Sequence, residues 1–375
     1  MSTPERLHAL VLWADDKSPN LGVRALARGT AELVRGRWPE AEITFQNYGS
    51  RIPQLPIGRL RSLLIERLLG RRGMQDWFRR FDLVIDTRSG DSFTDGYGLR
   101  RLAVMTAVGV FAAQAGVPVV LGPQTVGPFT TRRGRALARA TLGSASAVLV
   151  RDSASARVVA ELGDRPCTQT TDVVFTLTAP QRRTSRDVIL NVSGLLWNPN
   201  PHVDWQLYRD AITSIACTLR SGGRTITLLA HVVRSASADS DIAAARELQS
   251  SLGALDPDDG PIELLIPDGL DEVREMLASA RVVIASRMHA CLNALSVGVP
   301  AVSLAYSDKA SPLLADLGWS YGVDLRNDPH PVTAALGQLR LAETADVAAV
   351  VARAQSARLA GEFALAHLRH EAVRA

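Results

Sequence analysis

Cysteine and long apolar runs are scarce in this sequence of 375 residues. Its three cysteines, Cys167, Cys217 and Cys291, lie far apart, which argues against a disulfide framework or a zinc cluster and fits a reducing compartment. No stretch approaches the ~20 apolar residues that span a bilayer, and the first apolar run lacks the flanks of a signal peptide. We therefore expect a cytoplasmic protein, with the inner face of the cell membrane as an alternative location.

Several familiar motifs are missing as well. The sequence has no HExxH, paired CxxC, P-loop or GxGxxG motif, so the simplest metal, kinase and nicotinamide functions are disfavoured. The net charge is only +4 and the basic residues are spread along the chain, so no nucleic-acid partner is expected. Lysine occurs only at Lys17 and Lys309 among 42 basic residues, which makes Lys309 conspicuous. We expect neither a metal nor a bound cofactor, and an oligomer is compatible with the sequence.

Apolar strand-like runs alternate with helical ones along the chain, which is typical of parallel sheets covered on both faces. The length exceeds the roughly 250 to 300 residues at which single cores stop growing, so two domains are expected. A polar stretch at 178–186 marks the linker. The sequence thus predicts an α/β protein with two Rossmann-like, doubly wound domains, 1–178 and 187–342, facing a cleft. A C-terminal helix within 343–375 is predicted to cross back to the first domain.

These predicted elements have approximate bounds. In the first half, strands are expected at 7–14, 42–46, 81–87, 117–121 and 147–150, and helices at 23–36, 99–115 and 133–142. In the second half, strands are expected at 187–192, 224–230, 262–266, 282–285 and 301–305, followed by a helical run over 344–374.

Residues 59–72 depart from this alternation because they mix a leucine stripe with arginines. Such a helix can lie on an anionic bilayer. The alternative is an ordinary amphipathic helix whose leucines are buried in the core and whose arginines are solvated.

Ligands of open α/β sheets bind beyond the carboxyl ends of the strands, which directs attention to the loops that follow them. The loop at 86–98 offers backbone N–H groups at Gly90, the hydroxyl of Ser92, and Asp91 or Asp95 as a proton acceptor. The alternative is a turn capped by Asx hydrogen bonds.

Two further loops follow strands of the first half. In Gly122 to Phe129, rigid proline and glycine positions place Gln124 and Gly127 for close approach to a ligand. Arg151 stands at the end of a strand, where it can face an anion or form an ion pair with Asp152 or another acid.

The richest segment is 285–300. Ser286 is a suitable helix N-cap, which would place Arg287 and His289 in the first helical turn, beside free N–H groups that favour phosphate or carboxylate. Cys291 is disfavoured as a nucleophile because it points away from His289 on a helix and no separate base is evident.

The ordered set of these motifs resembles the polysaccharide pyruvyltransferase family. The segments that carry the resemblance are 89–98, 122–129, 150–152, 171–173, 228–232 with His231, 286–290 and 305–309. The resemblance implies a GT-B-like fold and transfer of pyruvate from phosphoenolpyruvate, as co-substrate, to two hydroxyls of a sugar, as a ketal. It implies that the first domain binds the acceptor and the second binds phosphoenolpyruvate.

The same resemblance suggests roles for individual residues. Arg287 and Arg151, with Lys309 as a third positive charge, would grip the anionic donor. His289 would transfer protons, with Asp91 as a second catalytic candidate. The helix terminus lowers and a bound phosphate raises the pKa of His289, and we expect the phosphate to prevail and make it the acid. The alternative is that the helix dipole prevails and His289 is the base for an acceptor hydroxyl, which makes Asp91 less necessary.

The remaining candidates complete the substrate site. His231 and Tyr306 belong to matched segments. Asn20 begins the segment Asn20-Leu21-Gly22. Val23 and Arg24 follow this segment, where the family often has an acidic residue. The acceptor would be a surface polysaccharide or glycolipid sugar, with a lipid-linked carrier as one form.

Two other functions fit the same pattern. A nucleotide-sugar glycosyltransferase of the same architecture would usually need a carboxylate on the helix at 287–297, which contains no Asp or Glu. A non-enzymatic sugar-binding or scaffold protein would not need arginine and histidine at one helix start.

Overall fold

The computed structural model describes residues 6–47, 57, 59–70, 73–163, 165–233, 239–255 and 260–368. The chain forms two compact units. The first comprises Met1–Asp16, Val23–Leu177 and Ala354–Ala375, and the second comprises Lys17–Gly22 and Thr178–Arg353. The predicted first domain included residues 17–22, whereas the structure groups this short segment with the second unit.

The first unit contains a six-stranded parallel sheet with the order β2-β1-β3-β4-β5-β6. Its strands are β1 (His8–Leu12), β2 (Glu42–Gln46), β3 (Leu83–Asp86), β4 (Val119–Gln124), β5 (Ala147–Val150) and β6 (Thr168–Gln169). Its helices include α1 (Leu21–Arg37), α2 (Leu60–Leu69), α3 (Met74–Phe78), α4 (Leu99–Gln114), α5 (Arg132–Ser144) and α6 (Ser153–Leu162), with 3-10 turns at Arg88–Gly90 and Val173–Thr176.

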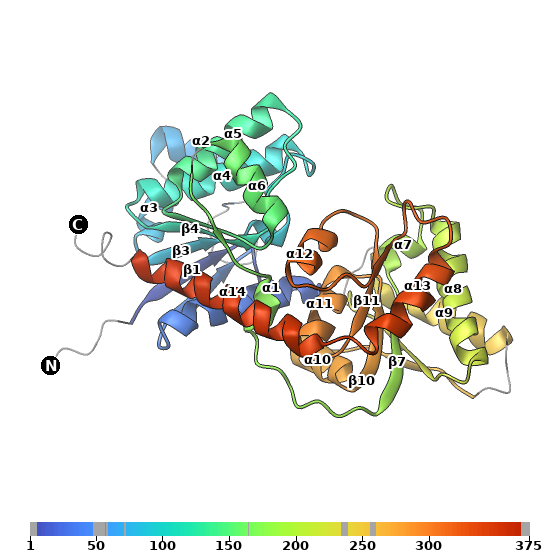
Figure 1. Ribbon diagram of the computed structural model, residues 1–375. Helices are drawn as coiled ribbons and strands as arrows, with labels where there is room; N and C mark the ends of the chain where they lie inside the picture. Colours follow the sequence, from blue (N-terminus) through green and yellow to red (C-terminus); the bar gives the residue numbers. More distant parts are fainter. Residues whose placement is uncertain are drawn as a thin grey trace. The chain divides into compact units, whose positions relative to one another are not determined.

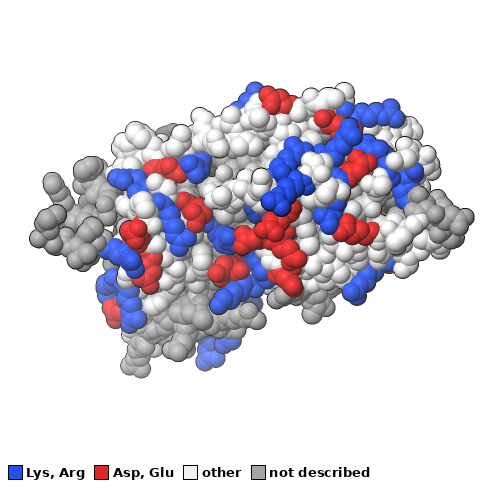
Figure 2. Space-filling model, turned by 90° about the horizontal axis from the view of Figure 1, so that it is seen from below, with Lys and Arg blue, Asp and Glu red and all other residues white. Residues whose placement is uncertain are grey.

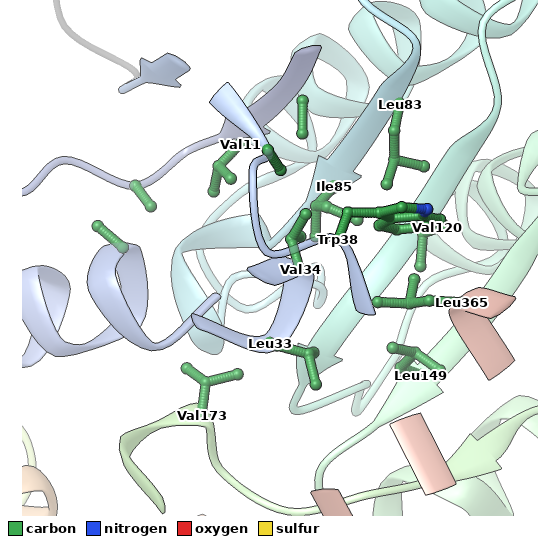
Figure 3. Close-up of a cluster of buried hydrophobic side chains, with 14 of the residues drawn as sticks. Val11, Leu33, Val34, Trp38, Leu83, Ile85, Val120, Leu149, Val173 and Leu365 are labelled. Atoms are coloured by element: carbon green, nitrogen blue, oxygen red, sulfur yellow. The ribbon is translucent and has the colours of Figure 1, made fainter. Parts of the chain in front are cut away.

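Successive side chains of these strands enter cores on opposite faces, as the two-residue period of a strand requires. Val11 packs with Trp38, which follows α1, and with Leu365 of the C-terminal helix α14 (Val347–His367) (Figure 3). Its neighbour Leu10 packs with Met105 of α4 on the other face. Figure 1 shows α14 along the sheet on the side away from α4.

The second unit contains another six-stranded parallel sheet, with the order β12-β11-β10-β7-β8-β9. Its strands are β7 (Arg186–Asn191), β8 (Ile226–Leu229), β9 (Glu263–Leu265), β10 (Ala280–Ala285), β11 (Ala301–Ala305) and β12 (Gly322–Asp324). Its helices are α7 (Gly194–Trp197), α8 (Trp205–Ser221), α9 (Asp241–Leu255), α10 (Leu270–Ala278), α11 (Met288–Ser296), α12 (Ala310–Asp316) and α13 (Pro331–Ala342). Read from β9, this is the order 3-2-1-4-5-6 of a Rossmann sheet, and its direction of winding reverses between β7 and β10.

The predicted α/β class with two parallel sheets is confirmed. The helical run expected over 344–374 is observed as α14, and residues 369–375 lie outside the described residues. No helix in the described part of the chain combines the length and apolar character needed to cross a membrane. On the face shown in Figure 2, basic and acidic side chains are interspersed.

Candidate functional site

The switch point of the second sheet is built around Asn191, the last residue of β7. Its buried side chain accepts a hydrogen bond from the backbone N–H of Arg287 at 3.0 Å and donates one to the carbonyl of Leu229 at 3.0 Å. The side chain therefore ties together the carboxyl ends of β7, β8 and β10. In doubly wound sheets this is the place where ligands bind.

The helix that follows β10 begins one residue later than predicted. Arg287 has extended backbone angles, φ −108° and ψ 128°, and is itself the N-cap of α11, so the prediction of Ser286 as the N-cap was wrong. The hydroxyl of Ser286 instead accepts a hydrogen bond from Tyr208 at 2.8 Å, and Tyr208 accepts one from the N–H of Ser193 at 3.0 Å. Burial raises the pKa of Tyr208, so this phenol stays protonated and links α8 to the site.

The guanidinium group of Arg287 is held at the switch point by two carboxylates. Its Nη2 lies 2.7 Å from Asp241 and 2.7 Å from Asp239, and its Nε also donates to Asp241 at 3.2 Å. Burial alone would lower the pKa of Arg287, but the charges of Asp241 and Asp239 raise it above its usual value. The side chain is 11% exposed, so Arg287 is a permanent, oriented positive charge at the edge of the protein surface.

Asp241 organises three loops at once, a role that the sequence analysis did not predict. This fully buried carboxylate accepts hydrogen bonds from the N–H groups of Gly194, His231 and Val232, in addition to Arg287. Gly194 is needed for this packing because a Cβ atom there would lie 2.1 Å from the carbonyl oxygen of Ser240. The loops after β7, β8 and β10 thus converge on one buried charge.

Two histidines flank this cluster. His231 is 1% exposed, and its Nε2 atom has no hydrogen-bond partner among the described residues. Burial, followed by the nearby charges of His289 and Arg287, lowers the pKa of His231 to about 3, so it is neutral at physiological pH. His289, the second residue of α11, is partly exposed, and Asn293 donates to its carbonyl at 2.8 Å. The structure therefore brings Arg287, His231 and His289 together.

The segment around Asn20 also reaches this cluster. Asn20 forms an antiparallel bridge with Val232, and its side chain accepts a hydrogen bond from Gly22 at 2.9 Å. A Cβ atom at Gly22 would lie 2.8 Å from Nδ1 of His289, so only glycine permits this close approach. Asn20 thus lies beside the predicted histidines, within the second unit.

The loop after β11 contributes Tyr306. Its phenol interacts electrostatically with Arg287, and its ring centroid lies 5.4 Å from that of His202. Lys309 follows in the same loop and is the N-cap residue of α12. A role for Lys309 in binding the donor stays a prediction.

In the first unit, the two loops predicted from the sequence are parts of one structure. Gly90 accepts a hydrogen bond from the N–H of Thr125 at 2.9 Å, and Phe93 forms a parallel bridge with Val126. Gln124, which is fully buried, donates to the carbonyl of Asp86 at 3.3 Å. These loops include the predicted residues Ser92, which is buried, and Gly127, whose φ is +82°.

The acidic candidates of this region have different surroundings. Asp91 is partly exposed and accepts a hydrogen bond from the hydroxyl of Tyr97 at 2.8 Å. Asp95 accepts hydrogen bonds from Thr130 and Thr131, which outweigh the effect of burial and lower its pKa. Asp95 therefore stabilises a turn, whereas Asp91 keeps an accessible carboxylate.

Arg151 forms the ion pair that the sequence offered as the alternative to anion binding. It is 1% exposed and lies 3.2 Å from Asp172, with Asp152 at 3.7 Å. Arg88, which the sequence did not single out, is similarly buried 2.9 Å from Asp86. Both arginines compensate buried carboxylates of the first unit.

Other predicted features can be placed as well. Cys291 is buried and burial raises the pKa of its thiol to about 12, which fits a packing role. Among the described residues, no group of three or more His, Cys, Asp and Glu side chains is arranged to hold a metal ion. The expectation that no metal is needed stays a prediction.

The fold is that of GT-B enzymes. Similar structures include a UDP-GlcNAc 2-epimerase from Neisseria meningitidis bound to UDP-GlcNAc, with a TM-score of 0.55 and 10% identity over 97% of this chain and 100% of that one. The Anabaena protein Alr3699/HepE in complex with UDP and glucose has a TM-score of 0.56 and 12% identity over 97% and 100%. UDP-GlcNAc 2-epimerase from Methanocaldococcus jannaschii has a TM-score of 0.54 and 10% identity over 90% and 93%.

The family is shown by the sequence itself. A model of the polysaccharide pyruvyl transferase family matches residues 20–308, and this chain belongs to that family. The suspected resemblance is confirmed. No curated protein sequence matches this one significantly.

The buried, neutral His231 predicts a pH dependence of stability. Because its pKa is about 3 in the folded protein and 6.5 as a model value, the unfolded chain takes up the proton more readily. The contribution of neutral His231 to the free energy of unfolding is complete above about pH 6.5 and is lost as the pH falls toward 3. Between pH 7 and pH 5, His231 should cost about 2 kcal/mol of unfolding free energy.

Urea denaturation of the wild type and His231→Phe at both pH values measures this difference. The variant should lose distinctly less stability than the wild type on acidification, while the exposed His330→Gln should match the wild type. If the wild type and His231→Phe lose the same free energy of unfolding between pH 7 and pH 5, His231 is not the neutral, buried group inferred from the structure.

Proposed function

We propose that this protein transfers the pyruvyl group of phosphoenolpyruvate to two hydroxyls of a surface-polysaccharide or glycolipid sugar, forming a pyruvate ketal. The observation that carries the proposal is the arrangement of Arg287, His231 and His289 at the switch point of the second sheet. A permanent cation beside a helix start suits a small anion that has both a carboxylate and a phosphate.

Arg287 would bind the donor through the part of its guanidinium that the carboxylates leave open. Asp241 and Asp239 take Nε and Nη2, and no hydrogen bond joins Nη1 to the described residues. The positive end of the dipole of α11, which begins after Arg287, favours phosphate oxygens. Lys309 and Tyr306 would contact the donor from the loop after β11.

His289 would supply the proton that the enol carbon of phosphoenolpyruvate needs. As C3 gains this proton, one acceptor hydroxyl adds to C2 and loses its own proton, which restores the histidine. Phosphate then leaves C2 with its bridging oxygen, and the second hydroxyl adds there and gives its proton to phosphate. The products are the ketal and inorganic phosphate, so atoms and charges balance. Neutral His231, behind His289, adds no competing positive charge.

Acceptor binding is proposed for Asn20 and for the paired loops of the first unit. Asp91 is a partly exposed carboxylate of these loops and accepts hydrogen bonds from the hydroxyls of Tyr97 and Ser92. It would orient the acceptor by accepting a hydrogen bond from one of its hydroxyls, with Gly90, Ser92, Gln124 and Gly127 shaping the loop. Arg151, which is buried against Asp172, would act on this region through packing.

A nucleotide-sugar glycosyltransferase is the second candidate, because the similar structures include complexes with UDP and UDP-GlcNAc. Against it, α11 (Met288–Ser296) contains no carboxylate for ribose hydroxyls. The distinguishing experiment incubates the protein with phosphoenolpyruvate or UDP-sugars and a panel of glycosides and lipid-linked sugars. Release of inorganic phosphate only with phosphoenolpyruvate and acceptor together supports the proposal, whereas release of UDP would favour the alternative.

The proposed reaction should proceed without a metal ion. Arginine and the helix terminus would supply the positive charge that a divalent ion supplies in many phosphate-binding enzymes. Phosphate release should therefore be unchanged in EDTA, with a Mg²⁺-dependent kinase as a control for complete chelation. Loss of activity in EDTA and its recovery on adding Mg²⁺ or Mn²⁺ would contradict this part of the proposal.

A further inference from the structure

Helix α2 of the first unit presents leucines on its outer face as well as on its inner face. Leu63 is 2% exposed and packs in the core with Val84 and Met105. In contrast, Leu64 is 54% exposed, Leu68 is 79% exposed and Leu69 is 56% exposed. The expectation that the leucine stripe is core is thus correct for only part of the helix.

Isolated exposed leucines are common on protein surfaces, but these three lie on a single helix of ten residues. Leu64 and Leu68 are four positions apart and therefore lie on one face, and exposed Arg61 precedes Leu64 by three positions on the same stripe. A surface helix normally turns polar side chains outward. We call Arg61, Leu64, Leu68 and Leu69 the outer stripe of α2.

The exposed charges at the start of α2 are positive, whereas its acidic residue is buried. Its one acidic residue, Glu66, is 7% exposed and accepts hydrogen bonds from the N–H groups of Met74 at 3.0 Å and Gln75 at 3.4 Å, at the start of α3. Arg59 and Arg61 are exposed.

We propose that the outer stripe of α2 binds the surface of an anionic lipid bilayer. Leucines on an exposed helix insert to the level of the headgroups and acyl carbons, while neighbouring arginines bind lipid phosphates. The combination of exposed leucines, exposed arginines and an inward-turned carboxylate complements a negatively charged, apolar surface. The inference does not depend on the proposed reaction, because lipid binding is measured without donor or acceptor.

The test is co-flotation of the full-length protein with vesicles of phosphatidylglycerol and phosphatidylcholine, compared with pure phosphatidylcholine. The wild type should float with the anionic vesicles only, and less so as salt is raised. Leu64→Ser/Leu68→Ser should weaken the binding by about tenfold or more. Arg61→Glu should weaken it by at least ~5-fold.

The matched control is Leu207→Ser/Leu255→Ser, which removes two leucines of comparable exposure, 67% and 66%, from α8 and α9 of the second unit. It should bind vesicles like the wild type. Far-UV circular dichroism should show all variants folded, since every replaced side chain is exposed. Absence of wild-type binding, or equal binding by Leu64→Ser/Leu68→Ser, would overturn the proposal. A wild-type dimer that this variant converts to a monomer, without lipid binding, would assign the stripe to a second copy of the chain and also overturn it.

Discussion

Replacement of His289 by alanine is expected to lower kcat by ~100 to 10,000-fold, the usual effect of losing a general acid or base. The proposed proton donor to C3 of phosphoenolpyruvate would be missing, while Arg287 and the start of α11 remain to bind the donor. The affinity for phosphoenolpyruvate should therefore change little. The measurement is the initial rate of phosphate release with a saturating acceptor, together with thermal unfolding to show that the variant is folded.

Arg287→Lys tests donor binding, whereas His289→Ala tests proton transfer. Lysine keeps the positive charge but loses the planar, two-pronged group that Asp241 and Asp239 orient. It should mainly raise the KM for phosphoenolpyruvate. A His289→Ala enzyme that turns over at nearly the wild-type rate would remove His289 from the mechanism and leave Asp91 and His231 as candidates.

Of the substitutions proposed here, Asp241→Asn should lower the free energy of unfolding the most. Asp241 is fully buried and accepts hydrogen bonds from three loops, one of which contributes Arg287. Asparagine would turn an NH₂ group toward these donors and leave Arg287 without its buried counter-charge. Breaking a buried ion pair in this way costs about 3–5 kcal/mol.

Urea denaturation followed by circular dichroism measures this cost. Asp210→Asn, which changes an exposed aspartate on α8 of the same unit, is the control and should stay within about 0.5 kcal/mol of the wild type. If Asp241→Asn is as stable as this control, the carboxylate is not the organising charge of the site.

The strands with continuous apolar runs could be predicted closely from the sequence. β5 (Ala147–Val150) and β11 (Ala301–Ala305) have the predicted bounds, because polar or Gly-Pro residues flank each run. β6 and β12 were missed because neither Thr168–Gln169 nor Gly322–Asp324 contains a continuous apolar run. Their formation depends on pairing with β5 and β11.

The positions of site residues that directly follow strands could also be predicted, because the carboxyl ends of parallel strands lie at one edge of the sheet. Arg287, His289 and His231 came together in the second unit on this principle. Asn20 follows β1 of the first sheet and was predicted in the first domain, and it joins them through its bridge with Val232. The roles of Ser286 and Asp241 could not be predicted. Each depends on a partner far along the chain, Tyr208 for the hydroxyl and three converging loops for the carboxylate.

The most direct test of the central claim is the binding of phosphoenolpyruvate to the purified protein, measured by isothermal titration calorimetry without any acceptor. We expect a saturable site for phosphoenolpyruvate in the wild type and in His289→Ala. Arg287→Lys should weaken this site by about tenfold or more, because two-pronged, charge-assisted hydrogen bonds are lost. UDP and UDP-sugars should not compete for it. Tight binding of a UDP-sugar that excludes phosphoenolpyruvate, or phosphoenolpyruvate binding that Arg287→Lys leaves unchanged, would contradict the account.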